Sequence, residues 1–150
     1  MTVRAADASD VPALCVLGRL FYGASQYAEF VEWDAASFET TARALINGSV
    51  PGRAFVFDDA DGAVVGMAAF VIAPFFFNLS ALFAQETFWY SAPGRRAGMP
   101  LLDAMEDEAR GLGAKTFVMS ALSGNRDPAF VRLYTKRGYR AAENSFIKVF

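Results

Sequence analysis

Apolar and polar positions along the chain follow two periods, one typical of helices and one typical of strands. Apolar residues at steps of three and four predict helices from Asp7 or Ser9 to about Tyr22, from Asp34 or Ser37 to Asn47, from Met99 to Gly111, and from Asp127 to Gly138. Short apolar runs bounded by turn residues predict strands at 2–5, 53–58, 63–72, 88–90, 115–122, 139–142 and 145–150.

This order of elements predicts an α/β fold, in which a mixed sheet is covered by helices on both faces. The chain has 150 residues and 54% of them are hydrophobic, which suits one domain spanning 1–150 with a sizeable core. We expect Phe117, Val118 and Met119 to be buried in their strand.

The segment from Ala63 to Ala84 contains no charged residue and is long enough to cross a membrane. Pro74 lies at its centre, Asn78 and Ser80 interrupt it, and no Lys/Arg cluster flanks it. Two buried strands joined by an irregular apolar loop at 73–83 explain the segment better. The loop must pack under something or against another subunit, so a homodimer is one option.

Composition excludes several classes of chemistry. A net charge of -2 gives no global attraction to nucleic acid or to an anionic membrane. The single cysteine, Cys15, excludes a disulfide framework and a cysteine-ligated zinc site, and the absence of histidine excludes His-based triads. Proton transfer must therefore use carboxylate, tyrosine, lysine or water. Residues 1–10 lack the apolar core of a signal peptide, so we expect a cytoplasmic location.

The segment from Glu86 to Gly113 combines a strand, a basic turn and a helix start. Arg95, Arg96 and Gly98 lie in the turn, where several backbone N–H groups converge. Such a turn is suited to an anionic ligand such as a phosphate. The alternative is an ordinary strand–turn–helix connection without a ligand.

This turn, the segment LYTKRGY at 133–139 and the order of elements together resemble the GNAT superfamily of acetyltransferases. The resemblance covers nearly the whole chain, and the segments FWYSAP and FFFN look most similar to small phage and proteobacterial members. It implies a mostly antiparallel sheet whose parallel fourth and fifth strands splay apart. It also implies acetyl-CoA as the acyl donor, with no metal.

In the superfamily, the turn motif Q/RxxGxG/A holds the pyrophosphate of acetyl-CoA. Pro100 replaces the usual small residue at the last position and removes one N–H donor, although proline suits the first turn of a helix. Asp127 stands where the superfamily often has Asn, and its carboxylate accepts rather than donates. The resemblance implies a cofactor site formed by Phe88, Trp89, Tyr90, Ser91, Arg95, Arg96, Ala97, Gly98, Met99, Leu101 and Asp127.

Two residues correspond to the superfamily's proton-transfer groups. Glu86 is the candidate general base, and strand alternation places it on one face with Phe88 and Tyr90. Tyr134 corresponds to the general acid that protonates the departing thiolate. Alternatively, Glu86 faces solvent at a strand end and Tyr134 is a core aromatic.

The acceptor pocket is expected to include aromatic and acidic residues that suit a cationic guest. They are Tyr22, Tyr27, Glu29, Glu32, Phe76 and Asn78. A solvated connection is the alternative for the segment 23–34.

The resemblance therefore implies an N-acyltransferase that moves an acetyl group to a small-molecule or peptide primary amine by direct attack in a ternary complex. The alternative is a catalytically silent module of the same fold that binds CoA or a protein partner.

Overall fold

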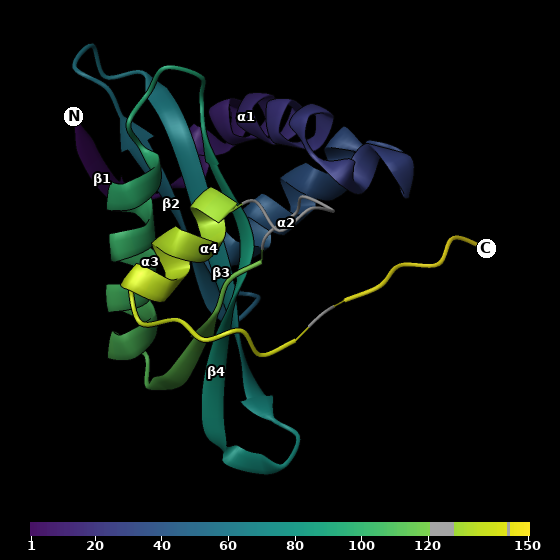
Figure 1. Ribbon diagram of the computed structural model, residues 1–150. Helices are drawn as coiled ribbons and strands as arrows, with labels where there is room; N and C mark the ends of the chain where they lie inside the picture. The colour runs from purple at the N-terminus through teal and green to yellow at the C-terminus, as the bar shows by residue number, and fades with distance from the viewer. Residues whose placement is uncertain (121–127, 144) are drawn as a thin grey trace.

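The computed structural model of the protein describes residues 1–120, 128–143 and 145–150. Its strands and α-helices, in chain order, are β1 Thr2–Ala5, α1 Val11–Ala24, α2 Ala35–Asn47, β2 Gly52–Asp58, β3 Val64–Phe75, β4 Asn78–Ser91, α3 Gly98–Gly111, β5 Ala114–Val118 and α4 Pro128–Lys136 (Figure 1). A short 3₁₀ turn, Gln26–Glu29, follows α1.

The strands form one five-stranded sheet in the order β1-β2-β3-β4-β5. All neighbours are antiparallel except β4 and β5, which are parallel. The parallel pairing ends at Gln85↔Val118, whereas β4 continues to Ser91. The predicted α/β class, with a mostly antiparallel sheet and a parallel pair that separates, is therefore confirmed.

Each face of the sheet has its own apolar core. α1 and α2 cover one face, where Leu14, Leu45 and Met67 belong to one cluster. α3 covers the other face, where Leu101 and Phe70 belong to a second cluster (Figure 1). The helical period predicted for α3 is confirmed, because Leu101, Leu102, Met105 and Ala109 are all buried along it.

The caps of α2 decide between two predicted starts. The Asp34 carboxylate accepts a hydrogen bond from the N–H of Ala36 at 2.9 Å, so Asp34 rather than Ser37 is the N-cap. Gly48 ends the helix with φ 78°, a left-handed conformation that glycine adopts without strain.

The irregular loop predicted at 73–83 is instead the end of a long hairpin. β3 continues to Phe75 and β4 starts at Asn78, so Phe76 and Phe77 form the connection. Cross-strand packing stabilises this end, because the rings of Phe75 and Phe83 lie 4.9 Å apart. Figure 1 shows the hairpin projecting from the rest of the sheet. Among the helices of the described ranges, none combines the length and apolarity needed to cross a bilayer.

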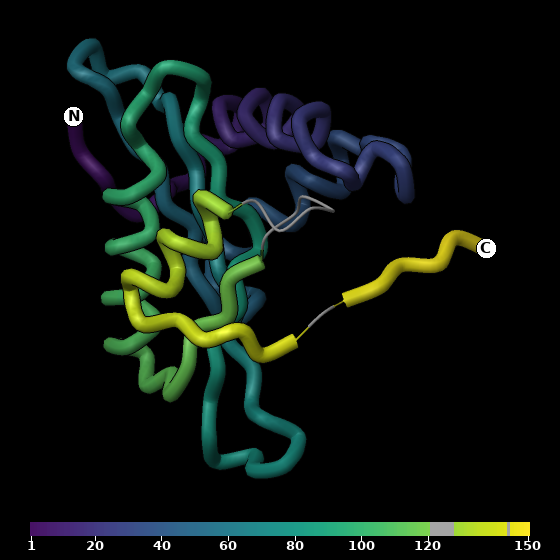
Figure 2. The backbone as a smooth tube through the Cα atoms, in the orientation of Figure 1, coloured from purple at the N-terminus to yellow at the C-terminus, as the bar shows by residue number. Residues whose placement is uncertain are grey.

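The predicted closing hairpin at 139–142 and 145–150 is wrong for the residues that the structure describes there. They form no strand, and Figure 2 shows 145–150 leading away from the sheet. A strand-forming pattern specifies a preference, but a strand also needs a neighbour that completes its backbone hydrogen bonds.

β5 is also shorter and less buried than predicted. It ends at Val118 rather than Leu122, which lies outside the described residues. Val118 is 40% exposed, and Phe117 is only half-buried. Within the described part of the chain, β5 has β4 as its one paired neighbour and forms an edge of the sheet.

Candidate functional site

A β-bulge changes the direction of side chains along β4. Ala69 pairs with Phe88, but Phe70 pairs with Glu86, so Thr87 is an extra residue on β4. Residues opposite each other in an antiparallel pair share a face. Glu86 therefore lies on the α3 face with Phe70, and Phe88 lies on the α1–α2 face with Ala69. The predicted shared face of Glu86 and Phe88 is wrong, because alternation fails at a bulge.

Glu86 lies where β4 has lost β5 as a paired neighbour. Burial raises the pKa of its carboxyl to about 7, and a hydrogen bond from the backbone of Ser120 opposes this shift. The Ser120 N–H donates to Glu86 Oε2 at a long 3.4 Å. Glu86 is thus a desolvated carboxyl that changes protonation near neutral pH, which is the property of a general base.

Tyr134, on α4, also contacts Ser120. Its hydroxyl donates to the backbone oxygen of Ser120 at 3.4 Å. Burial and the charge of Glu86 raise the pKa of the Tyr134 phenol above its ordinary value. The phenol therefore stays protonated at neutral pH and can donate a proton. The structure brings Glu86 and Tyr134 to the backbone of one residue, Ser120.

Tyr27, in the turn after α1, is also affected by the charge of Glu86. Burial and then the charge of Glu86 raise the pKa of Tyr27. Its ring packs edge-on against Phe21 with centroids 6.4 Å apart, and Phe21 packs against Tyr90 of β4 at 6.0 Å. Tyr27 is thus a predicted acceptor residue whose electrostatic environment includes Glu86.

The other predicted acceptor residues make contacts elsewhere, are exposed or lie at the hairpin tip. The Tyr22 hydroxyl donates to the oxygen of Val31 at 2.8 Å, and its ring packs against Trp33. Glu29 and Glu32 are exposed. Phe76 and Asn78 lie at the hairpin tip, and Asn78 is about 25 Å from Glu86 along β4, from the rise per residue of a strand.

Trp89 joins β4 to the two helices on the α3 face. Its indole N–H donates to the Gly98 oxygen at 2.8 Å, at the start of α3. Its ring lies 6.2 Å from Phe130 and 6.5 Å from Tyr134, both on α4. Trp89 therefore fixes the spacing between the first turn of α3 and the aromatic face of α4.

Ion pairs and hydrogen bonds connect the C-terminal end of α4 to α3. Arg137 donates to Asp103 at 2.7 Å and to Glu106 at 2.8 Å. The Tyr139 hydroxyl donates to Glu106 at 2.7 Å. This clamp holds the C-terminal end of the helix that carries Tyr134.

The turn between β4 and α3 is braced by Ser91. Its hydroxyl donates to the Arg95 oxygen at 2.9 Å and accepts from the Ala97 N–H at 3.3 Å. The Leu101 N–H donates to the Ala97 oxygen at 3.1 Å, and the Leu101 side chain is fully buried. Ala97 and Leu101, both predicted cofactor contacts, thus have their N–H groups engaged within the protein.

The first turn of α3 retains donors for an anion. No side chain caps this helix within the described residues, and the first N–H groups of a helix have no intrahelical partner. Pro100 has no N–H, so Gly98 and Met99 supply the donors that remain. Their position at a helix N-terminus favours negative charge.

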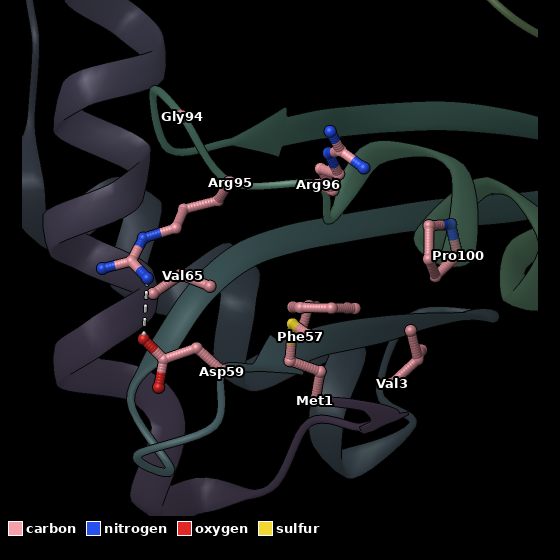
Figure 3. Close-up of a pocket in the computed structure, with 9 residues that line it drawn as sticks. All are labelled: Met1, Val3, Phe57, Asp59, Val65, Gly94, Arg95, Arg96 and Pro100. Atoms are coloured by element: carbon pink, nitrogen blue, oxygen red, sulfur yellow. Dashed lines mark ion pairs between the residues drawn. The ribbon is translucent and has the colours of Figure 1, made fainter.

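The two arginines of the turn differ in their partners. The Arg95 guanidinium pairs with Asp59 Oδ2 at 3.2 Å. Figure 3 shows Arg95 reaching toward Asp59 beside a cavity of about 520 Å³, while the Arg96 side chain points away from Asp59. Arg96 is exposed and has no ion pair with any described residue. Arg96 is therefore better placed than Arg95 to meet a phosphate.

Two residues near the candidate site, Ser120 and Thr87, could not be recognised in the sequence. One predicted residue, Asp127, is not among the residues that the structure describes. Ser120 contributes backbone atoms, so its residue type carried no signal. Thr87 is singled out only by the bulge. Asp127, predicted to contact the cofactor, lies outside the described residues.

Comparison with known proteins identifies the fold. No family model and no curated protein matches the sequence. Similar solved structures include an acetyltransferase from Trypanosoma brucei, with TM-score 0.71, 19% identity and 99% of each chain covered. The ribosomal-protein-alanine N-acetyltransferase from Brucella melitensis biovar Abortus has TM-score 0.69 and 18% identity over 100% of each chain. A transcriptional regulator from Bacillus halodurans has TM-score 0.76 and 14% identity, with 99% of each chain covered.

The chain has the GNAT acetyltransferase fold. At these identities the likeness shows the fold alone, because one fold carries many functions. Any activity of this chain therefore depends on the residues around Glu86, Ser120 and Tyr134.

Proposed function

We propose that this protein is an acyltransferase that moves an acetyl group from acetyl-CoA to a primary amine by direct attack in a ternary complex. The observation that carries the proposal is the meeting of Glu86 and Tyr134 at the backbone of Ser120. One group can accept a proton near neutral pH and the other can donate one. A base and an acid are both useful in this reaction, because the amine must lose a proton and the departing thiolate must gain one.

Glu86 acts as the general base in this proposal. A lysine-like amine has a pKa of about 10 and arrives protonated, so it must lose a proton before it attacks. A carboxyl with a pKa of about 7 is ionised in a useful fraction of molecules at neutral pH and is more basic than an exposed glutamate. No covalent enzyme intermediate is required.

Tyr134 acts as the general acid. A thiol has a pKa of about 8.5, so its thiolate needs only modest help to leave. The phenol of Tyr134 stays protonated because burial and Glu86 raise its pKa. The clamp formed by Arg137 and Glu106 holds α4 in place for this role.

The residues of the β4–α3 turn fit the diphosphate of acetyl-CoA. When bound, acetyl-CoA would supply the activated acyl group. The N–H groups of Gly98 and Met99 and the Arg96 side chain would hold the diphosphate, and the β4 backbone from Trp89 to Ser91 would face the acyl group. Pro100 removes one donor, so we expect weaker phosphate binding than a small residue at that position would allow.

A second candidate is a catalytically silent module that binds CoA or a protein partner. Exposed apolar residues at the hairpin tip favour it, since Phe76, Phe77 and Leu79 are 81%, 86% and 74% exposed.

Calorimetric titration with acetyl-CoA, followed by thiol release with spermidine, kanamycin and an alanyl-terminated peptide, separates these candidates. We expect binding and amine-dependent thiol release, with CoA as the binding control. No binding at millimolar acetyl-CoA would refute the enzyme. Binding without thiol release for any amine of the panel would favour the silent module.

A further inference from the structure

The C-terminal segment Ser145 to Phe150, which we call the C-terminal arm, is apolar but uncovered. In an extended chain, Phe146 and Phe150 lie on one side, and Ile147 and Val149 lie on the other. All four side chains are exposed, and the two phenylalanines are 94% and 107% exposed. A contiguous apolar surface of this kind is typical of an interaction site. The arm has the pattern of a strand for which the described part of one chain supplies no paired neighbour.

β5 has an edge that suits such a strand. Within 1–120, 128–143 and 145–150, β4 is the one strand paired with β5, so the other side of β5 is an open edge of the sheet. β5 has five residues and the arm has six, so their lengths match. The sheet has an apolar core on each face, and Phe117 of β5 packs against the core beneath α3. A sheet covered on both faces accommodates strands with apolar side chains on both sides, as in the arm.

The course of the chain indicates which copy supplies the strand. After α4, the Tyr139 hydroxyl donates to Glu106 of α3 at 2.7 Å, which holds the chain against that helix. Figure 2 shows the arm leading away from the sheet of its own chain. We propose that the arm of one copy pairs with the β5 edge of a second copy, and that the second copy returns its own arm to the first. This inference does not depend on the proposed acyltransferase function.

Reciprocal exchange gives a closed dimer of sufficient area. Two identical contacts related by a twofold axis use both arms and both edges, whereas one-way addition leaves an arm and an edge free to add further copies. Four phenylalanine side chains, two from each arm, bury roughly 600–1,000 Å² when they are covered. A specific interface needs about 1,000 Å² in total, counted over both partners. The surface that the rings cover, together with Ile147 and Val149, brings the total above this requirement.

The first test measures the mass of the protein in solution by sedimentation velocity over a concentration series, and we expect a dimer. Phe146→Ser combined with Phe150→Ser removes the exposed rings of the arm, and should weaken the dimer by at least about a hundredfold in Kd. Phe77→Ser removes a similarly exposed ring at the hairpin tip and is the matched control, which should leave the dimer unchanged. Far-UV circular dichroism and Tm show whether each variant is folded.

The second test identifies the copy whose β5 receives the arm. In a Cys15→Ser background, Thr116→Cys on β5 and Val149→Cys in the arm are made in separate chains. The two variants are unfolded together in urea, refolded as a mixture and treated with a short bismaleimide. Exchange between copies brings the two introduced thiols together, so we expect a covalent pair of chains on a denaturing gel. Either variant refolded alone should give much less of this product.

A wild type that remains monomeric throughout the concentration series would overturn the inference. A dimer that Phe77→Ser abolishes and the double arm variant retains would overturn it as well, because the interface would then be the hairpin tip. A mixture without the covalent pair would also contradict exchange, and an internal link in one chain carrying both cysteine substitutions would assign the arm to its own β5. If the double arm variant does not fold, the cross-linking result decides.

Discussion

β4 pairs with β3 along most of its length, yet its two ends have different surroundings. At the hairpin tip, Phe77 and Leu79 are 86% and 74% exposed. At the other end, Glu86 and Thr87 carry buried polar groups, and Ser91 braces the turn into α3. The tip exposes large apolar side chains, whereas the buried part contains the carboxyl with a shifted pKa. Desolvation, rather than residue type alone, therefore distinguishes the candidate site.

The largest effect is expected at Glu86. Glu86→Gln keeps the shape of the side chain but removes the base, so kcat should fall by about 10²–10⁴-fold. Steady-state thiol release measures this loss. Asp61→Asn, at the exposed β2–β3 turn, is the matched control and should retain activity. A Glu86→Gln enzyme with wild-type kcat would exclude Glu86 as the base.

Tyr134→Phe should lower kcat by roughly tenfold or more, with little change in the Kd for acetyl-CoA. The leaving thiolate is only moderately basic, which keeps the expected loss smaller than at Glu86. Turnover and calorimetry on the same preparation separate the two quantities. Equal losses in binding and turnover would point to a packing role beside Trp89 instead.

The pH dependence tests the desolvation of Glu86. The rate should rise with pH through a midpoint near 7 as the carboxylate forms. Because the folded-state pKa lies above the ordinary value of 4.5, the folded protein binds more protons than the unfolded chain between these two values. The contribution of Glu86 to stability is therefore present below pH 4.5 and is lost as pH rises through 7.

Urea unfolding at a series of pH values measures this effect. The free energy of unfolding of the wild type should fall more between pH 5 and pH 8 than that of Glu86→Gln, in which the group cannot ionise. Parallel curves for the two proteins would contradict the buried environment of Glu86.

The smallest effect is expected at the tip. Phe77→Ser should change the free energy of unfolding by no more than about 0.5 kcal/mol, because the ring buries little surface. It should leave kcat unchanged. Urea unfolding and thiol release measure both quantities, and a large loss of stability would show that the tip packs against another molecule.

Local patterns were sufficient for the helices. The apolar steps in α3 and the Gly48 end of α2 depend on nearby residues, so they could be predicted from the sequence, and Asp34 was one of two predicted N-caps of α2. The roles predicted for Glu86 and Tyr134 relied on a family resemblance, because the two residues lie on separate elements. Their meeting at Ser120 is a tertiary feature.

The strands show where local reasoning fails. The bulge at Thr87 inserts one residue into β4 and reverses the face of Glu86 relative to Phe88, and no composition or period marks it. The segment 145–150 has an apolar strand pattern but no strand in the structure. A bulge and a strand are both properties of paired chains, so a single segment does not specify them.

The sequence by itself determined the α/β class, the amphipathic helices and the absence of histidine-based chemistry, because each depends on residue type and on spacing along the chain. Only the tertiary structure decided that Arg95 pairs with Asp59 and that Glu86 is desolvated. The burial of the Thr87 hydroxyl was also visible only there. These features depend on which distant atoms surround a group and on how much water they exclude, and neither is encoded at any one position.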